Sequence, residues 1–136
     1  MIPEYPRPSP PDSPIDEYAV VQLCNGLLKD SILNERDCLE VLPPVSGRLF
    51  TIRGRTHGIW EEIMAPPAII YQRLIRRLKV MAEVDLVRPQ PLGRGRFRFI
   101  VDQERYDVGI TVRARPDGTE IAEIQIATTP ADAKSS

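Results

Sequence analysis

Apolar positions recur along the chain at two spacings, and each spacing predicts one type of secondary structure. From Val20 to Ile32 they follow a period of 3.6 residues, which predicts a helix that begins after Ser13 and ends near Glu35. A hydroxyl followed by proline suits the start of a helix, where backbone N–H groups lack partners. A second helix is expected from about Ala68 to Val84, with an apolar row made of Ile70, Leu74, Leu78 and Met81.

Elsewhere apolar and polar residues alternate, which predicts strands with one buried and one exposed face. A short strand at 39–41 is expected, then a hairpin that joins 48–55 to 59–64, then an irregular segment at 88–91 and three more strands. Loops of hairpin length cannot make parallel crossovers. The order α-β-β-β-α-β-β-β therefore predicts an α+β domain with a six-stranded antiparallel sheet and both helices packed on it.

Composition divides the 136 residues into one domain and two tails. Six of the 14 prolines fall within residues 1–14, which predicts a disordered proline-rich tail; the domain is expected over 15–127 and a flexible tail over 128–136. Cys24 and Cys38 form no C-x-x-C pair, which fits free thiols in the cytoplasm, and Cys24 lies on the apolar stripe of the first helix. No apolar run approaches the roughly 20 residues of a membrane span, so no membrane insertion is expected.

The motifs of common catalytic and cofactor sites do not occur in the sequence. None of the eight glycines is followed by lysine, so the phosphate-binding pattern G-x-x-x-x-G-K-[ST] does not occur, and neither does G-x-S-x-G, H-E-x-x-H or G-x-G-x-x-G. The single histidine, His57, cannot complete a zinc site that needs two. We therefore expect a protein that is not an enzyme and that uses no metal or cofactor.

Positive charge is concentrated in the middle of the chain, although the net charge is −1. Residues 48–115 contain 14 Lys and Arg against 7 Asp and Glu, and residues 94–99 alternate arginine with glycine and phenylalanine. Such a strand is typical of an RNA-binding sheet, but the glycine spacing of a ribonucleoprotein motif is missing. A charged outer face over an aromatic core explains the same alternation, and both interpretations stay open at this point.

Several segments resemble type II secretion and type IV pilus assembly ATPases, in the domain that precedes their motor core. The helix IIYQRLIRRLKVMAEVDL at 69–86 resembles the family's ISRLKVMAGLDIAE, and IRGRTHG at 52–58 resembles VRYRIDG. Weaker likenesses place 107–111 on DLRVS and 118–125 on GExVVLRLL, and the resemblance extends over 19–126. It implies a PAS-like fold and a stand-alone, degenerate relative of that accessory domain, without Walker motifs.

The resemblance also implies which residues face a partner. Arginines of this domain approach the nucleotide phosphates bound in the motor domain of the family, and Arg53, Arg55 and Arg96 stand at matching positions. Gly109 and Gln125 stand where the family has arginine. The three arginines are therefore expected to converge on one edge that meets a nucleotide, contacted only in the complex, or an acidic patch of a partner.

Three functions of different classes follow from these observations. The first is a non-enzymatic assembly or regulatory module of a type II secretion or type IV pilus system. It would dock on an ATPase or on a separately encoded motor domain, in the cytoplasm and peripheral to the inner membrane through its partner. The second is an RNA- or DNA-binding module that uses the arginine-aromatic strand. The third is a small-ligand sensor, by analogy with PAS-like sheets.

Overall fold

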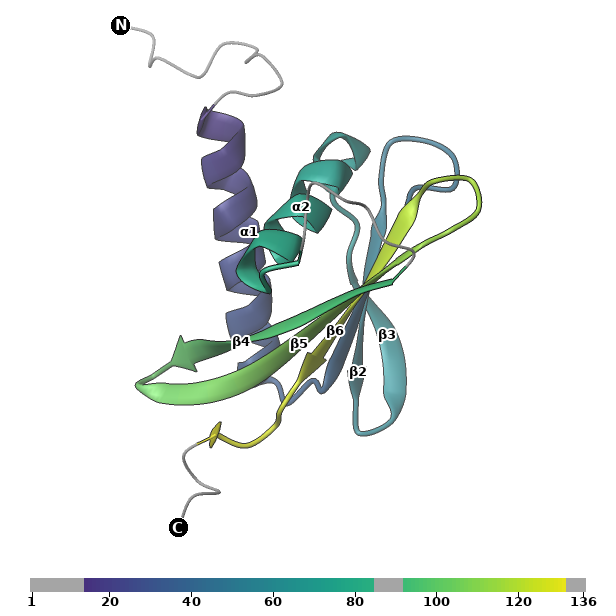
Figure 1. Ribbon diagram of the computed structural model, residues 1–136. Coiled ribbons are helices and arrows are strands. Elements are labelled where there is room, and N and C mark those ends of the chain that lie inside the picture. Colours follow the sequence, from purple (N-terminus) through teal and green to yellow (C-terminus); the bar gives the residue numbers. More distant parts are fainter. Residues whose placement is uncertain (1–13, 85–91, 132–136) are drawn as a thin grey trace, which may run out of the picture.

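Six antiparallel strands form one open sheet in the order β3-β2-β1-β6-β5-β4 (Figure 1). The structure is a computed structural model that describes residues 14–84 and 92–131. The expected tail at 1–14 except Pro14, the irregular segment at 88–91 and residues 132–136 lie outside the described residues. The strands are β1 (Cys38–Leu42), β2 (Thr51–Thr56), β3 (Ile59–Met64), β4 (Leu92–Val101), β5 (Glu104–Ala114) and β6 (Glu120–Ile126).

The strand order follows from hairpins and one return of the chain. Hairpins join β2 to β3, β4 to β5 and β5 to β6, and every pairing is antiparallel. The last strand, β6, pairs with β1, so the two ends of the domain meet in the middle of the sheet. The predicted α+β class, the antiparallel sheet and the element order are confirmed.

Both helices lie on one face of this sheet (Figure 1). Helix α2 (Tyr71–Met81) contacts β4, β5 and β6, and helix α1 (Pro14–Leu33) packs against α2 and β4. The second helix was predicted from Ala68, but the turn η1 (Ala68–Ile70) is a 3-10 helix, and Ile69 in it is 84% exposed. Pro67 is extended and precedes this first 3-10 turn, and the α-helix proper begins at Tyr71 and ends at Met81, three residues before the expected end at Val84.

The core lies between the helices and the sheet. Alternate strand residues point into it, as the period of two requires. The buried members from the strands are Leu39, Val41, Ile52, Val108, Ile110, Val112, Ala122, Ile124 and Ile126. Phe50 meets Tyr71 edge to face, with ring centroids 5.0 Å apart. Cys24 is fully buried there, and burial raises the pKa of its thiol to about 11, so it packs as a small apolar residue, as expected.

The helix that carries the clearest family resemblance makes two polar contacts with the sheet and approaches the backbone of β4 closely. The Lys79 ammonium forms an ion pair of 2.6 Å with the Glu120 carboxylate, and the Tyr71 hydroxyl donates to the Glu120 carbonyl. A Cβ atom at Gly95 would overlap the carbonyl oxygen of Ala82. Strand β4 can therefore approach the end of α2 only because residue 95 has no side chain.

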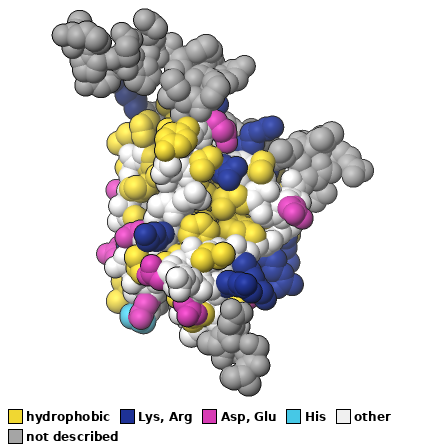
Figure 2. Space-filling view, turned by 90° about the vertical axis from the view of Figure 1, so that its left-hand side faces the viewer, with side chains coloured by type: hydrophobic (Ala, Val, Ile, Leu, Met, Phe, Trp, Pro, Cys, Tyr) yellow, Lys and Arg dark blue, Asp and Glu magenta, His cyan; other side chains and the backbone are white. Residues whose placement is uncertain are grey.

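The outer surface of α1 keeps some apolar character. Tyr18 is 66% exposed and Leu33 57% exposed. Figure 2 shows this side of the molecule, with apolar side chains along its middle and separate groups of basic and acidic side chains toward its margins.

Candidate functional site

The face of the sheet that the helices leave open carries most of its polar side chains. Strand pairing places Arg96, Gly109, Gln125, Cys38 and Arg55 directly opposite one another in a single row across five strands. Residues opposite one another in antiparallel strands point to the same face. The four positions matched to family arginines along this row, at 55, 96, 109 and 125, thus belong to one surface, and we call this surface the open face.

In one half of the open face, over β1, β2 and β3, Arg53 and Arg55 are paired with carboxylates of the chain. Arg53 contacts Glu40 at 2.6 Å, and Arg55 contacts Asp37 at 2.9 Å. Both guanidinium groups also lie over the ring of Trp60, at 4.8 and 5.4 Å from its centroid. Such stacking is favourable because the ring face is electron-rich.

These contacts also change the acidity of two neighbouring groups. The hydrogen bonds from Arg55 hold the pKa of Asp37 below its ordinary value of 3.8. Burial raises the pKa of the Cys38 thiol to about 11, and the Glu123 carboxylate acts in the same direction. Because a thiolate is the reactive form, Cys38 has no features of a nucleophile.

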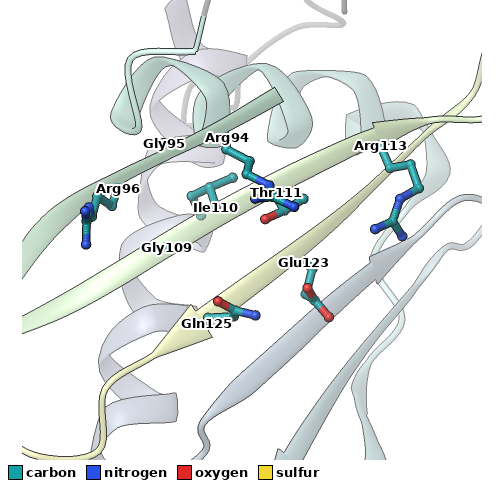
Figure 3. A pocket seen from close by; sticks show the side chains of 9 residues that line it. All are labelled: Arg94, Gly95, Arg96, Gly109, Ile110, Thr111, Arg113, Glu123 and Gln125. Atoms are coloured by element: carbon teal, nitrogen blue, oxygen red, sulfur yellow. The ribbon is translucent and has the colours of Figure 1, made fainter. Parts of the chain in front are cut away.

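The other half of the open face, over β4, β5 and β6, contains a hollow of about 520 Å³ (Figure 3). Its lining residues are Arg94, Gly95, Arg96, Gly109, Ile110, Thr111, Arg113, Glu123 and Gln125. Gly109 contributes no side chain, and the nearest atom to a Cβ placed there is Gln125 Oε1 at 3.9 Å. The hollow therefore exists in part because residue 109 is glycine.

Arginines from two strands surround this hollow. Arg94 and Arg96 come from β4 and Arg113 comes from β5, and all three side chains are exposed. Within the described part of the chain, none of the three forms an ion pair. Glu123 on β6 is the acidic residue that lines the hollow. The hollow is thus a positively charged recess in which side-chain N–H groups can donate hydrogen bonds to an anion.

The predicted site residues share the open face but do not converge on one edge. Arg53 and Arg55 lie on β2, and Arg96 lies on β4, so β1, β6 and β5 stand between them. At about 4.8 Å per strand, four spacings separate them by about 19 Å. The expectation that the three arginines converge on one edge is therefore wrong. The insertion of β6 into the middle of the sheet separates β2 from β4.

Arg94 and Arg113 were not predicted as site residues. Arg94 could have been found, since it lies two residues before Arg96 and leaves the same face of a strand. Arg113 reaches the hollow only through the register that pairs it with Leu92, and local alternation does not reveal that register.

The alternation of arginine and phenylalanine on β4 places the two residue types on opposite faces of the sheet. Phe97 and Phe99 pack against the core, and the arginines at 94, 96 and 98 lie on the open face. The interpretation as a charged face over an aromatic core is confirmed. Single-stranded nucleic acids are bound by aromatic rings on which bases stack, and these two rings are not presented for that purpose.

Neither a membrane-spanning helix nor a cluster of metal ligands is found among the residues that the structure describes. None of its helices is long and apolar enough to cross a membrane. Between residues 14 and 84 and between 92 and 131, no three His, Cys, Asp or Glu side chains come together as metal ligands.

Comparison with known proteins gives relatives of one kind. The chain is 27% identical over 96 residues to type II secretion system protein E of Pectobacterium carotovorum, covering 71% of this chain and 19% of that protein. It is 30% identical over 90 residues to the type IV pilus assembly ATPase PilB of Pseudomonas aeruginosa, covering 66% and 16%. The chain resembles part of the type II secretion and type IV pilus assembly ATPases. PilB of Myxococcus xanthus is 34% identical over 71 residues.

The likeness covers only a small part of these ATPases. The chain spans about a fifth of the length of the curated relatives it matches, or less. No protein-family model matches it. The family resemblance expected from the sequence is confirmed at this level.

Proposed function

We propose that this chain is a non-enzymatic assembly or regulatory module of a type II secretion or type IV pilus system, and that it docks on an ATPase motor. The observation that carries the proposal is the match to part of these ATPases in a sequence that holds no P-loop. Phosphoryl transfer needs a phosphate cradle, a lysine and a held Mg²⁺. The 136 residues are therefore expected to hydrolyse no ATP by themselves.

We propose further that the fold is PAS-like. In support, the last strand inserts beside the first at the centre of an antiparallel sheet, and a helix crosses from the β2–β3 hairpin to β4 on one face only. The module would work in the cytoplasm and reach the inner membrane through its partner.

The open face is the docking surface that the geometry favours. The opposite face is covered by α1 and α2 and is devoted to the core. The open face offers exposed arginines and a hollow, which suit a charged partner surface. A nucleotide bound to the motor would contact this face only within the complex.

Co-purification tests this proposal. The chain is expressed with the secretion or pilus ATPase of the same genome, and an ATPase of an unrelated family serves as the control. We expect the secretion or pilus ATPase alone to be retained. Equal retention of both, or ATP turnover by the pure chain that a point substitution in the chain abolishes, would contradict the proposal.

A further inference from the structure

Arginines on the open face follow a regular pattern of pairing. Three of them engage a carboxylate that belongs to a neighbouring strand or to the residue just before it. Three ion pairs show this pattern: Arg53 with Glu40 at 2.6 Å, Arg55 with Asp37 at 2.9 Å, and Arg98 with Asp107 at 3.1 Å. Arginine and carboxylate groups form these pairs readily because the guanidinium fork matches the two carboxylate oxygens.

The pattern stops at the hollow. Arg94 stands opposite Thr111, and Arg96 stands opposite Gly109, so neither has a carboxylate in the position that Asp107 holds for Arg98. Arg113 stands between Leu92 and Ile121. Among residues 14–84 and 92–131 these three arginines have no ion-pair partner, and Figure 3 shows them around the recess.

We propose that the hollow binds carboxylate side chains of an acidic segment of a partner protein. The partner would supply from outside the acceptors that Gly109 and Thr111 do not provide. This inference deepens the proposed function and relies on it only for the protein that carries the segment. The chemistry rests on the arginines of this chain.

Two features favour carboxylates over phosphate. Backbone N–H groups of a sheet lie in its plane, so a recess on its face offers only side-chain donors, whereas phosphate sites typically add a helix N-terminus or a nest of backbone amides. Glu123 also lines the hollow, and it repels a phosphate, whose charges sit on one group, more strongly than a segment whose single charges lie on separate side chains.

The size of the hollow favours a segment of chain over a free ion. A recess of about 520 Å³ on an open surface is larger than one carboxylate group, so a single ion would leave most of it filled with water. A segment with neighbouring acidic side chains can engage Arg94, Arg96 and Arg113 together.

The test uses the whole chain and needs no identified partner. An acetylated hexaglutamate peptide is titrated into the parent chain by calorimetry, and inorganic tripolyphosphate is titrated at the same ionic strength. The variant Arg94→Ala/Arg113→Ala is compared with the control Arg48→Ala/Arg76→Ala, which removes the same charge at two exposed arginines that do not line the hollow.

We expect the parent to bind the peptide and the hollow variant to bind it at least tenfold more weakly, with the control within twofold of the parent. Glu123→Gln should bind the peptide two- to fivefold more tightly, because it removes the repelling charge. Gly109→Leu keeps every charge and fills the recess, so it should also weaken binding; it serves if the arginine variant does not fold.

Three outcomes would overturn the inference. In the first, the parent fails to bind the peptide. In the second, tripolyphosphate binds over tenfold more tightly than the peptide, and Arg94→Ala/Arg113→Ala abolishes tripolyphosphate binding. In the third, sedimentation shows that the parent self-associates and that Arg94→Ala/Arg113→Ala does not, which assigns the hollow to a second copy. If the peptide test fails and the ATPase still co-purifies, only this inference is lost. If the peptide binds but no ATPase co-purifies, the proposed function is lost and the carboxylate site remains.

Discussion

The two faces of the sheet differ in what their residues do. On the helix-covered face, Gly95 admits the end of α2 and Lys79 joins α2 to β6. On the open face, Gly109 leaves a hollow and the arginines around it have no ion-pair partner within the described residues. The segment that resembles the secretion ATPases most clearly belongs to the covered face. The most similar segment therefore helps to form the core, whereas the residues that are available to a partner lie on the open face.

Alanine substitutions at two glycines on neighbouring strands should differ most in their effect on stability. Gly95→Ala drives a methyl group into the backbone of Ala82 and should lower the free energy of unfolding by about 1–3 kcal/mol. Gly109→Ala has open space and should change the free energy by no more than about 0.5 kcal/mol. Urea denaturation followed by circular dichroism measures both. Equal losses would show that the hollow is not open as described.

A second contrast compares an ion pair on each face. The Lys79 and Glu120 side chains are 15% and 19% exposed, whereas Arg98 and Asp107 are 56% and 48% exposed. Lys79→Met leaves a shielded carboxylate without its partner and should cost about 1–3 kcal/mol. Arg98→Met should cost at most about 1 kcal/mol, because exposed pairs contribute little. Denaturation of the two variants in parallel tests this, and a larger loss for Arg98→Met would reverse the assignment of roles.

The smallest expected effect depends on pH. Because Arg55 lowers the pKa of Asp37 in the folded state, the pair stabilises the fold at pH values above the ordinary pKa of 3.8. That contribution is lost as the pH falls through the lowered value in the folded state.

Thermal melting at pH 7 and at pH 3 measures this contribution. The difference in melting temperature between the parent and Arg55→Ala should shrink at pH 3. A difference that is unchanged or larger at pH 3 would show that the Arg55–Asp37 pair does not stabilise the fold.

Local patterns were sufficient to predict most of the fold. Periods of 3.6 and two located α1 and every strand, and Pro116-Asp117-Gly118 marked the turn before β6. The strand expected over 48–55 begins only at Thr51, because residues 48–50 form an isolated bridge with 66–68 instead. The expected bounds of α2 were too wide, because its first turn has 3-10 geometry and the α-helix ends at Met81. The expected tails and the segment at 88–91 stay predictions, since the described residues do not include most of them.

The site was less accessible from sequence. Arg96 was found by resemblance, and its companion Arg113 is 17 residues away in the chain and reaches the hollow through strand register. Arg53 and Arg55 have the residue type and the face that were expected, but Glu40 and Asp37 already occupy their guanidinium groups. Sequence patterns give the direction of a side chain within one strand; they do not give its partner on the next strand.

The affinity of the chain for the secretion or pilus ATPase, measured by calorimetry for the parent, Arg96→Ala and Arg55→Ala, tests the proposed docking most directly. Each charge-assisted hydrogen bond is worth about 1.5–3 kcal/mol, so Arg96→Ala should weaken binding about tenfold or more. Arg55→Ala should leave the affinity within about twofold, because Arg55 is engaged with Asp37 and Trp60. The proposed docking is contradicted if both variants bind as tightly as the parent, or if Arg55→Ala alone weakens binding.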